Sequence, residues 1–322
     1  MNYKKWMGID VSKEKIDLSI FDGKNYEHVV LKNERKVLKK FFSRLKNKEQ
    51  FHVIMEATGI YHLVLFKTLV ALKIDVSVVN PLIIKRYSEM KMMRAKTDMV
   101  DAKLIALFGY EQKPKLSKLP NKVQSEIFAL FKAVRIFQKY LISLRNQLLA
   151  LESCESENKI IIKELKKNMR SNTKSIEKLE QKIDDLIKEN FDDLSKRLQE
   201  IEGVGPKTSS MVIGYFGKFE NFETAKQVVS FVGLNPNPRL SGKSVNRGSN
   251  ISKKGNSMMR KILYLAALSA KNYNPDCHDL YQRLLKKGKP KVKALVAVAN
   301  KLLRQIFAIA KYDRKWKSDY VK

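Results

Sequence analysis

The chain is poor in cysteine and histidine, and it has no long apolar run. Its 322 residues include only two cysteines, Cys154 and Cys277, which excludes a disulfide framework and indicates an intracellular protein. The four histidines accompany no cysteine cluster, so no zinc site of the usual ligand spacing is expected. No apolar run approaches the roughly 20 residues that span a bilayer, and residues 1–10 lack the apolar region of a secretory signal.

Acidic residues are scarce beside basic ones. The chain has 64 Lys and Arg against 33 Asp and Glu, a formal net charge of +31. Such a surplus repels itself and attracts polyanions, so nucleic acid is the expected partner. An anionic membrane surface, or a lysine-rich composition without a function behind it, is the alternative. Residues 196–322 hold 26 basic and 8 acidic residues, a net charge of +18, so the positive charge is densest there.

The first of three segments, residues 1–120, combines strands with helices. Three short strands form a meander, and strands then alternate with helices, which predicts an α/β domain with a mixed sheet flanked by helices. Asn80-Pro81 predicts a break after the last strand. The expected strands are Lys5–Asp10, Ile16–Phe21, Tyr26–Leu31, Phe51–Glu56 and Ile74–Val79, and the expected helices are Glu34–Leu45, Tyr61–Leu72 and Asp98–Tyr110.

The second segment, residues 121–195, has the apolar spacing of a coiled coil. A heptad seam runs from Val123 to Leu151, is interrupted by the polar stretch Glu152–Asn158, and resumes from Ile162 to Leu186. This predicts an antiparallel coiled-coil hairpin with arms of about 40 Å, or arms that pair with those of another protomer. We expect a scaffold that supports a homo-oligomer, a dimer or a tetramer, with Asn172 fixing the register.

Four carboxylates in the first segment follow strand ends or share a helix face. Asp10 closes the first strand and Glu56 the fourth, where carboxyl ends of strands gather ligands. Asp98 and Asp101 are spaced i, i+3, which places them on one helix face. Oxygen ligands of this kind suit Mg²⁺ or Mn²⁺, and paired metals serve phosphodiester chemistry. Each carboxylate taken alone is equally well a helix cap or a surface charge.

The third segment, residues 196–322, is expected to be mainly α-helical and opens with a glycine-containing turn. Ile201–Thr208 contains Gly203, Gly205 and Lys207 between two amphipathic helices, and it looks like a helix-hairpin-helix element. Backbone N–H groups at a helix N-terminus bind phosphate, so a nucleic-acid contact is expected here. A tight interhelical turn without a ligand is the alternative.

A long stretch rich in glycine, proline and serine, Gly233–Gly255, is expected to be a loop between helices. A serine in it would need activation to act as a nucleophile, and physical chemistry alone does not distinguish Ser241 from Ser244, Ser249 or Ser252. A phosphate-binding loop without chemistry is the alternative. The residues expected to contact nucleic acid are Arg239, Lys243, Arg247, Lys253, Lys254, Asn256 and Arg260.

These motifs together resemble a known family. The first resemblance is to the ribonuclease H-like fold of Holliday-junction resolvases such as RuvC. It rests on a strand that ends in Asp, a strand that ends in Glu and a helix that begins with Asp-x-x-Asp. Gly8–Ser12, Glu56–Gly59 and Lys96–Ala102 resemble the DEDD-type insertion-sequence transposases more narrowly. Gly233-Leu234-x-Pro236, Ser241-Gly242 and Arg247–Asn256 resemble the C-terminal domain of the same family, whose members use a structured bridge RNA and whose relatives invert pilin genes.

The resemblance implies a site-specific DNA recombinase that mobilises an insertion sequence. It implies that Ser241 is the nucleophile, that Asp10, Glu56, Asp98 and Asp101 hold Mg²⁺, that donor and target DNA are substrates and that a guide RNA takes part. We expect it to be cytoplasmic and nucleoid-associated in a prokaryote, with no membrane partner. Two alternatives stay open: a metal-dependent resolvase-type nuclease whose C-terminal domain only binds DNA, and a non-enzymatic nucleic-acid-binding protein.

Overall fold

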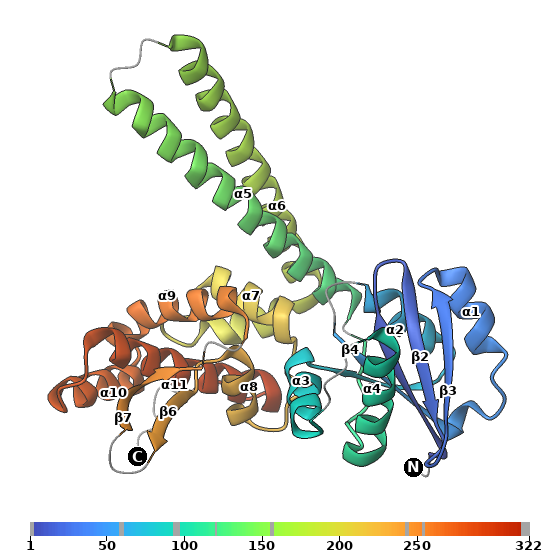
Figure 1. Ribbon diagram of the computed structural model, residues 1–322. Coiled ribbons are helices and arrows are strands. Elements are labelled where there is room, and N and C mark those ends of the chain that lie inside the picture. Colours follow the sequence, from blue (N-terminus) through green and yellow to red (C-terminus); the bar gives the residue numbers. More distant parts are fainter. Residues whose placement is uncertain are drawn as a thin grey trace. The chain divides into compact units, whose positions relative to one another are not determined.

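The computed structural model describes residues 3–57, 61–92, 97–119, 121–154, 158–241, 245–252 and 255–316, without the side chains of 237–241 and 245–250 (Figure 1). The chain divides into two compact units, Met1–Leu119 and Pro120–Lys322. The predicted boundaries at 120 and 195 stay predictions. In the described ranges, no helix combines the length and apolar character that crossing a bilayer requires.

A five-stranded mixed sheet forms the centre of the N-terminal unit. Its strand order is β3-β2-β1-β4-β5, with β1, β2 and β3 antiparallel and β4 and β5 parallel to β1. The predicted α/β character of this unit is confirmed, and the mixed sheet fits a ribonuclease H-like domain. The strands are β1 (Lys5–Val11), β2 (Lys15–Phe21), β3 (Tyr26–Lys32), β4 (Phe51–Glu56) and β5 (Asp75–Val79).

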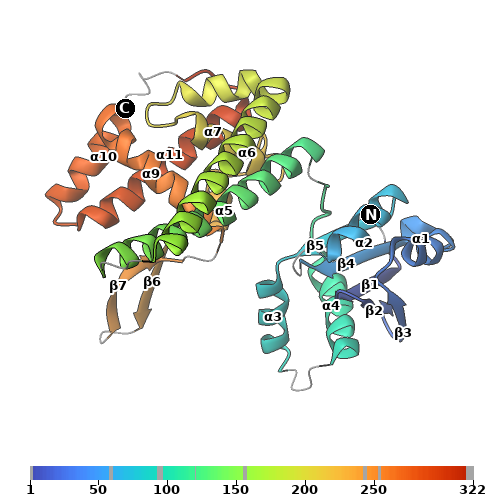
Figure 2. The same cartoon turned by 90° about the horizontal axis from the view of Figure 1, so that it is seen from above.

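Helices cover both faces of this sheet, as Figure 2 shows. On one face α1 (Arg35–Ser43) and α2 (His62–Ala71) pack on Met7, Ile9 and Val53. On the other, α3 (Pro81–Met90) and α4 (Asp98–Gln112) pack around Trp6 and Ile54. A single 3₁₀ turn, η1 (Lys48–Gln50), precedes β4.

The helix α3 is absent from the expected element order, because Asn80-Pro81 was interpreted as a break. The pair instead begins a helix: the Asn80 side chain accepts a hydrogen bond from the Leu82 N–H at 2.9 Å, and Pro81 occupies the first helical position. Proline is favoured there because the N–H that it lacks has no partner within the helix.

Two long helices form the first part of the C-terminal unit. The helices α5 (Lys122–Ser153) and α6 (Lys159–Gln199) lie side by side as an antiparallel hairpin (Figure 1). The α6 backbone departs from helical geometry at Phe191. Asn172 is buried in α6, and its side-chain N–H donates to the Phe137 carbonyl of α5 at 2.7 Å. The supercoiling of the two helices stays a prediction.

Five helices and a two-stranded ribbon complete the C-terminal unit. Its core joins Ile127, Phe131 and Ile183, from the base of the hairpin, to buried residues such as Leu263 and Leu302 of the later helices. The elements are α7 (Pro206–Phe216), α8 (Ala225–Val232), β6 (Pro236–Ser241), β7 (Val245–Ile251), α9 (Ser257–Tyr273), α10 (Pro275–Lys286) and α11 (Lys291–Tyr312).

The prediction of a loop over Gly233–Gly255 is wrong for most of that stretch. β6 and β7 pair as an antiparallel ribbon with an irregular register between Asn237 and Arg239. The strand sequences PNPRLS and VNRGSNI consist mostly of Pro, Asn, Arg, Gly and Ser, and Pro, Asn, Gly and Ser are typical of loops, so the sequence predicted a loop. Residues 242–244, between the strands, lie outside the described part of the chain.

Candidate active site

Asp10 and Glu56 occupy adjacent positions at the carboxyl ends of neighbouring parallel strands. Each lies one residue beyond the paired Ile9 and Met55. Both are half-buried, whereas the residues before them are fully buried. Because side chains in register on parallel strands point to the same face, the two carboxylates project from one side of the sheet.

The N-terminal turn of α4 brings Asp98 and Asp101 to the same region. Thr97 caps the helix by accepting a hydrogen bond from the Val100 N–H. α4 lies directly on β1 at Gly8, where an added Cβ would fall 2.1 Å from the Ala106 nitrogen and 2.2 Å from the Ala102 oxygen. This glycine therefore permits the close approach that sets the first turn of α4 beside the end of β1.

Electrostatics show that the four predicted carboxylates form one group. The pKa of the Asp10 carboxyl is raised to about 6, first by burial and then by the negative charges of Asp98, Asp101 and Glu56. Since each of these charges disfavours ionisation of Asp10, the structure brings together all four acidic residues that the sequence singled out.

A lysine and a fifth carboxylate on β2 complete this cluster, and sequence reasoning missed both. The Lys15 ammonium lies 2.7 Å from Asp98 and 3.0 Å from Asp17, and it holds the pKa of Asp98 below its usual range. Asp17 is buried, pairs across the strands with Asp10, and lies 3.3 Å from His28 Nε2. The available signal was an acidic residue, Asp17, in the expected strand Ile16–Phe21 with Lys15 directly before that strand, but only the strand register places Asp17 opposite Asp10.

The chemistry of this donor set suits a hard divalent cation, because every candidate ligand is a carboxylate oxygen. Within the ranges that the structure describes, no three His, Cys, Asp or Glu side chains are close enough to surround a metal ion. The two findings agree, because charges act over several ångströms whereas Mg²⁺ coordination needs about 2.0–2.1 Å. The described carboxylates are therefore close enough to influence one another's ionisation but not close enough to enclose a metal ion, and Asp98 is paired with Lys15.

Ser241 is the last residue of β6, in the C-terminal unit. In the ribbon it pairs with Val245, and Arg239 pairs with Arg247 two positions earlier. Four further predicted or alternative residues, Lys243, Ser244, Lys253 and Lys254, lie outside the described residues, as do Thr58, Gly59, Lys96 and Gly242 of the quoted motifs. The two arginine positions are thus paired with each other, two positions before the serine on the ribbon.

Asn256 and Arg260 join the end of the ribbon to the helical core. The Asn256 side chain caps α9 by accepting hydrogen bonds from the N–H groups of Met258 and Met259. Arg260 Nη1 donates to the carbonyls of Val232 and Gly255, each at 2.9 Å. Both side chains, predicted to contact nucleic acid, hold the protein's own backbone in this structure.

The turn between α6 and α7 carries the other predicted nucleic-acid contacts. Gly203 has a φ of +95°, and a Cβ there would fall 2.6 Å from the Cβ of Ala270, so this position requires glycine. Gly205 caps α7 and has open space around its Cβ position. Lys207 forms an ion pair with Glu180 of α6. Gly205 therefore leaves the N-terminus of α7 accessible.

Comparison with known proteins identifies the family. A DEDD transposase model of the IS110 group, described as "Transposase", matches residues 7–151, and a "Transposase IS116/IS110/IS902 family" model matches residues 195–282. The chain belongs to the IS110/IS116 transposase family. Family membership makes it an enzyme of DNA transposition and recombination, with DNA as substrate, and the DEDD type indicates a nuclease-like site that depends on a divalent metal.

Relatives of this transposase extend over its full length. The pilin gene-inverting proteins of Moraxella bovis and Moraxella lacunata are each 28% identical over 320 residues, which is 97% of both chains. The transposase for insertion sequence element IS1111A of Coxiella burnetii is 33% identical over 134 residues, 40% of this chain and 36% of that protein. T. thermophilus RuvC in complex with a Holliday junction substrate matches 36% of this chain and all of its own, with 12% identity and a TM-score of 0.29.

Proposed function

We propose that this transposase is a site-specific recombinase of an insertion sequence, in which Asp10, Glu56, Asp98 and Asp101 hold Mg²⁺ and Ser241 is the nucleophile. The observation that carries the proposal is the grouping of Glu56, Asp98 and Asp101 around Asp10, whose pKa is raised by burial and by these three charges. In chain order they read Asp, Glu, Asp, Asp, the order of the letters in the family type.

The carboxylates supply the negative site that a divalent cation neutralises. When bound, Mg²⁺ stabilises the charge that builds up on phosphate oxygens during displacement. Three elements of the protein position these carboxylates. Asp10 lies at the end of β1, Glu56 lies at the end of β4, and Asp98 and Asp101 lie in the capped first turn of α4. Lys15 balances part of this charge until a metal and a DNA phosphate arrive.

Ser241 supplies the covalent step. Its Oγ forms a bond to a DNA phosphorus, the bond from that phosphorus to one sugar oxygen breaks, and the serine proton ends on the released sugar hydroxyl. The reverse reaction with a second DNA end rejoins the strands without an external energy source. Arg239 and Arg247 form the ribbon pair two positions before Ser241, and we propose that they balance charge on the phosphate.

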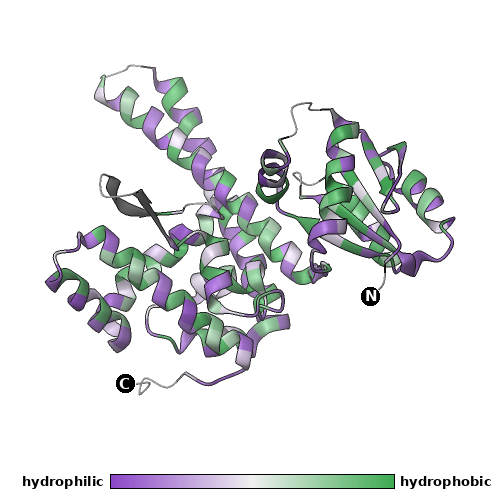
Figure 3. Cartoon of the chain, turned by 60° about the horizontal axis from the view of Figure 1, so that its bottom comes forward, coloured by the Kyte–Doolittle hydropathy of each residue, from purple (hydrophilic) through white to green (hydrophobic). Residues whose placement is uncertain are grey.

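The helical hairpin is proposed to join copies of the chain into a dimer or tetramer. Large apolar side chains are exposed along it, among them Ile136 at 67%, Ile142 at 58% and Ile160 at 78%. Figure 3 shows apolar bands that alternate with polar ones along the two helices. Pairing of hairpins would cover these bands and would let the serine of one protomer serve the carboxylates of another. The remaining surplus of positive charge suits a guide RNA.

A metal-dependent nuclease is the second candidate, because all four carboxylates lie in one unit that contains no part of the ribbon. In that case DNA is nicked hydrolytically, and the C-terminal unit only binds DNA through Gly203, Gly205, Lys207 and its cations. A non-enzymatic nucleic-acid-binding protein would tolerate replacement of all four carboxylates.

One experiment separates these functions. The protein, Mg²⁺, donor and target DNA and the element's own transcript are incubated, denatured and resolved on a gel. The proposal predicts protein-linked DNA ends that vanish in Ser241→Ala and persist in Ser249→Ala and Ser252→Ala. Asp10→Asn and Glu56→Gln should also lose them, whereas Asp279→Asn, an exposed carboxylate on α10, is the control for charge. Nicking that survives Ser241→Ala without adducts supports the nuclease and contradicts the serine assignment.

A further inference from the structure

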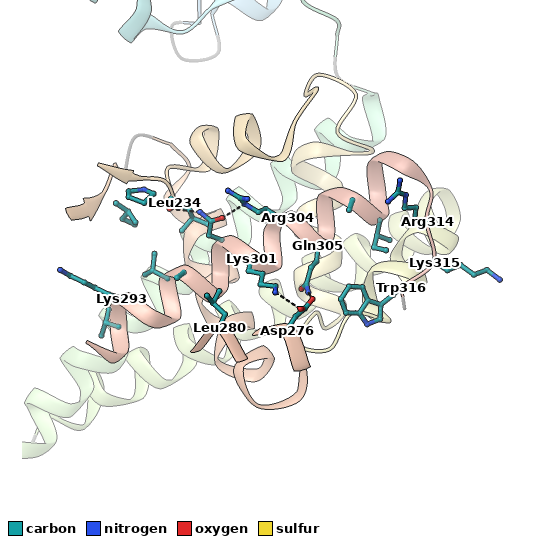
Figure 4. Close-up of a pocket in the computed structure, with 18 residues that line it drawn as sticks. Leu234, Asp276, Leu280, Lys293, Lys301, Arg304, Gln305, Arg314, Lys315 and Trp316 are labelled. Carbon is teal, nitrogen blue, oxygen red and sulfur yellow. Dashed lines mark hydrogen bonds and ion pairs between the residues drawn. The ribbon is translucent and has the colours of Figure 1, made fainter. Parts of the chain in front are cut away.

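A large groove in the C-terminal unit lies apart from the residues assigned above. It has a volume of about 900 Å³ and runs along α11. Its walls come from α10, from the start of β6 and the end of β7, and from the segment after α11 (Figure 4). We call it the α11 groove. Among the residues that the structure describes, its lining includes none of the four carboxylates.

The floor of the α11 groove is apolar. It is lined by Leu280 of α10 and by Val296, Ala297, Ala308 and Ile309 of α11. An apolar lining of this kind favours flat apolar groups such as nucleobases over water. An apolar floor alone would suit many ligands, so the charged rim of the groove indicates which class of ligand binds.

The rim of the groove is strongly basic. The one carboxylate among its described lining residues, Asp276, is neutralised by Lys301 at 2.9 Å and accepts a hydrogen bond from Gln305. The other cations face no acidic lining residue, so the lining has a net charge of +4. Figure 4 shows cations from one end of the groove to the other. They are Lys293, Lys301, Arg304, Arg314 and Lys315.

The groove is physically joined to the ribbon that carries Ser241. Leu234, Pro236 and Ile251, at the feet of β6 and β7, line one end of it. Asn300 of α11 donates to the Leu234 carbonyl at 3.4 Å and accepts from Arg304 Nε at 3.0 Å, which orients the arginine beside the ribbon. From Pro236 to Ser241 the strand spans at most ~17 Å, at about 3.3 Å per residue.

We propose that the α11 groove binds single-stranded DNA next to the phosphodiester that Ser241 attacks. Its bases lie on the apolar floor and its phosphates contact Lys293, Arg304 and Arg314. A duplex hides the flat faces of its bases, so an apolar floor adds little to its binding, whereas a single strand offers both bases and phosphates. The position of the scissile phosphate in this inference rests on the proposed function. The binding of single-stranded DNA rests on the groove alone.

Binding can be measured without bond breakage. Full-length protein carrying Ser241→Ala is titrated into a fluorescently labelled oligothymidylate at several NaCl concentrations, and fluorescence anisotropy gives the affinity. In that background, Lys293→Gln with Arg304→Gln removes two rim cations. Lys286→Gln with Lys287→Gln, at the exposed end of α10, removes the same charge outside the groove.

The groove variant should bind DNA more weakly than the control, and its dependence of log K on log salt should be shallower by about 1.4, since each phosphate contact to a single strand contributes about 0.7. Ala297→Trp should fill the floor and weaken binding roughly tenfold with the salt dependence unchanged. Circular dichroism checks that each variant is folded, and the Lys293→Gln, Arg304→Gln variant carries the test if Ala297→Trp does not fold.

Three results would overturn the inference. Equal losses in the groove and control variants would show that only net charge matters. Loss of binding to an RNA of the same length, with DNA binding intact, would assign the groove to RNA. A change in sedimentation without DNA, again with DNA binding intact, would make it a protein interface. Because Ser241 is already replaced, failure of the serine chemistry leaves this test unaffected.

Discussion

Replacing Asp10 by Asn should stabilise the metal-free protein at neutral pH while removing its activity. In the folded state the pKa of Asp10 is about 6, against an ordinary value of 3.8, mainly through burial. The unfolded chain therefore releases this proton at lower pH than the folded chain. Wild-type stability falls as pH rises from 3.8 to about 6 and then levels off. Asparagine resembles the protonated carboxyl and avoids that loss.

The size of the effect follows from the same two pKa values. Their difference corresponds to at most about 3 kcal/mol in the free energy of unfolding. Solvent screening at this half-buried carboxyl reduces the expected gain to about 1–2 kcal/mol. The gain should be full above pH 6 and should shrink toward zero as pH falls to 3.8.

Urea unfolding of wild type and Asp10→Asn between pH 4.5 and 8, in EDTA, measures this difference. Asp279→Asn removes an exposed carboxylate on α10 and controls for net charge. Added Mg²⁺ should stabilise the wild type more than the variant, since a ligand that binds only the folded state stabilises it. A gain that is equal at all pH values, or none above pH 6, would refute the reasoning that the carboxylates converge on Asp10.

Three other changes probe the same account. Gly8→Ala should lower the free energy of unfolding by about 3 kcal/mol, because its Cβ meets the α4 backbone, whereas Gly205→Ala, with open space, should change it by under about 0.5 kcal/mol in denaturant titrations. Asn172→Ala should cost about 1 kcal/mol in the same assay by leaving the Phe137 carbonyl without its donor. Lys15→Met should tighten Mg²⁺ binding in calorimetry by removing a cation that competes for Asp98, and weaker binding would instead make Lys15 a positioning residue.

The sequence predicted best what depends on local pattern. Asp10 and Glu56 lie at the ends of apolar strands, and the i, i+3 pair Asp98 and Asp101 lies at the start of a helix. Strand and helix periodicity, with the order of the elements, was therefore enough to predict that these four residues form one group. Lys15 and Asp17 escaped notice because their place in the cluster depends on the antiparallel register of β1 and β2, which local pattern does not specify.

Two other features needed three-dimensional context. Asn80-Pro81 is compatible with both a break and a helix start, and only the capping hydrogen bond to Leu82 distinguishes them. The α11 groove joins residues from 234 to 316, and no spacing along the chain reveals it. The strands β6 and β7 are rich in Pro, Asn, Gly and Ser, so their sequences resembled a loop.

The central claim is that one serine and four carboxylates break and rejoin DNA together. Adducts formed with Mg²⁺, both DNA partners and the transcript are digested with trypsin and nuclease, and the nucleotide-linked peptide is sequenced by mass spectrometry. The account predicts a single linked residue, Ser241, with no adduct in Asp10→Asn or in EDTA. Nucleotide on another residue, or nicked DNA with no linked peptide in the wild type, would contradict it.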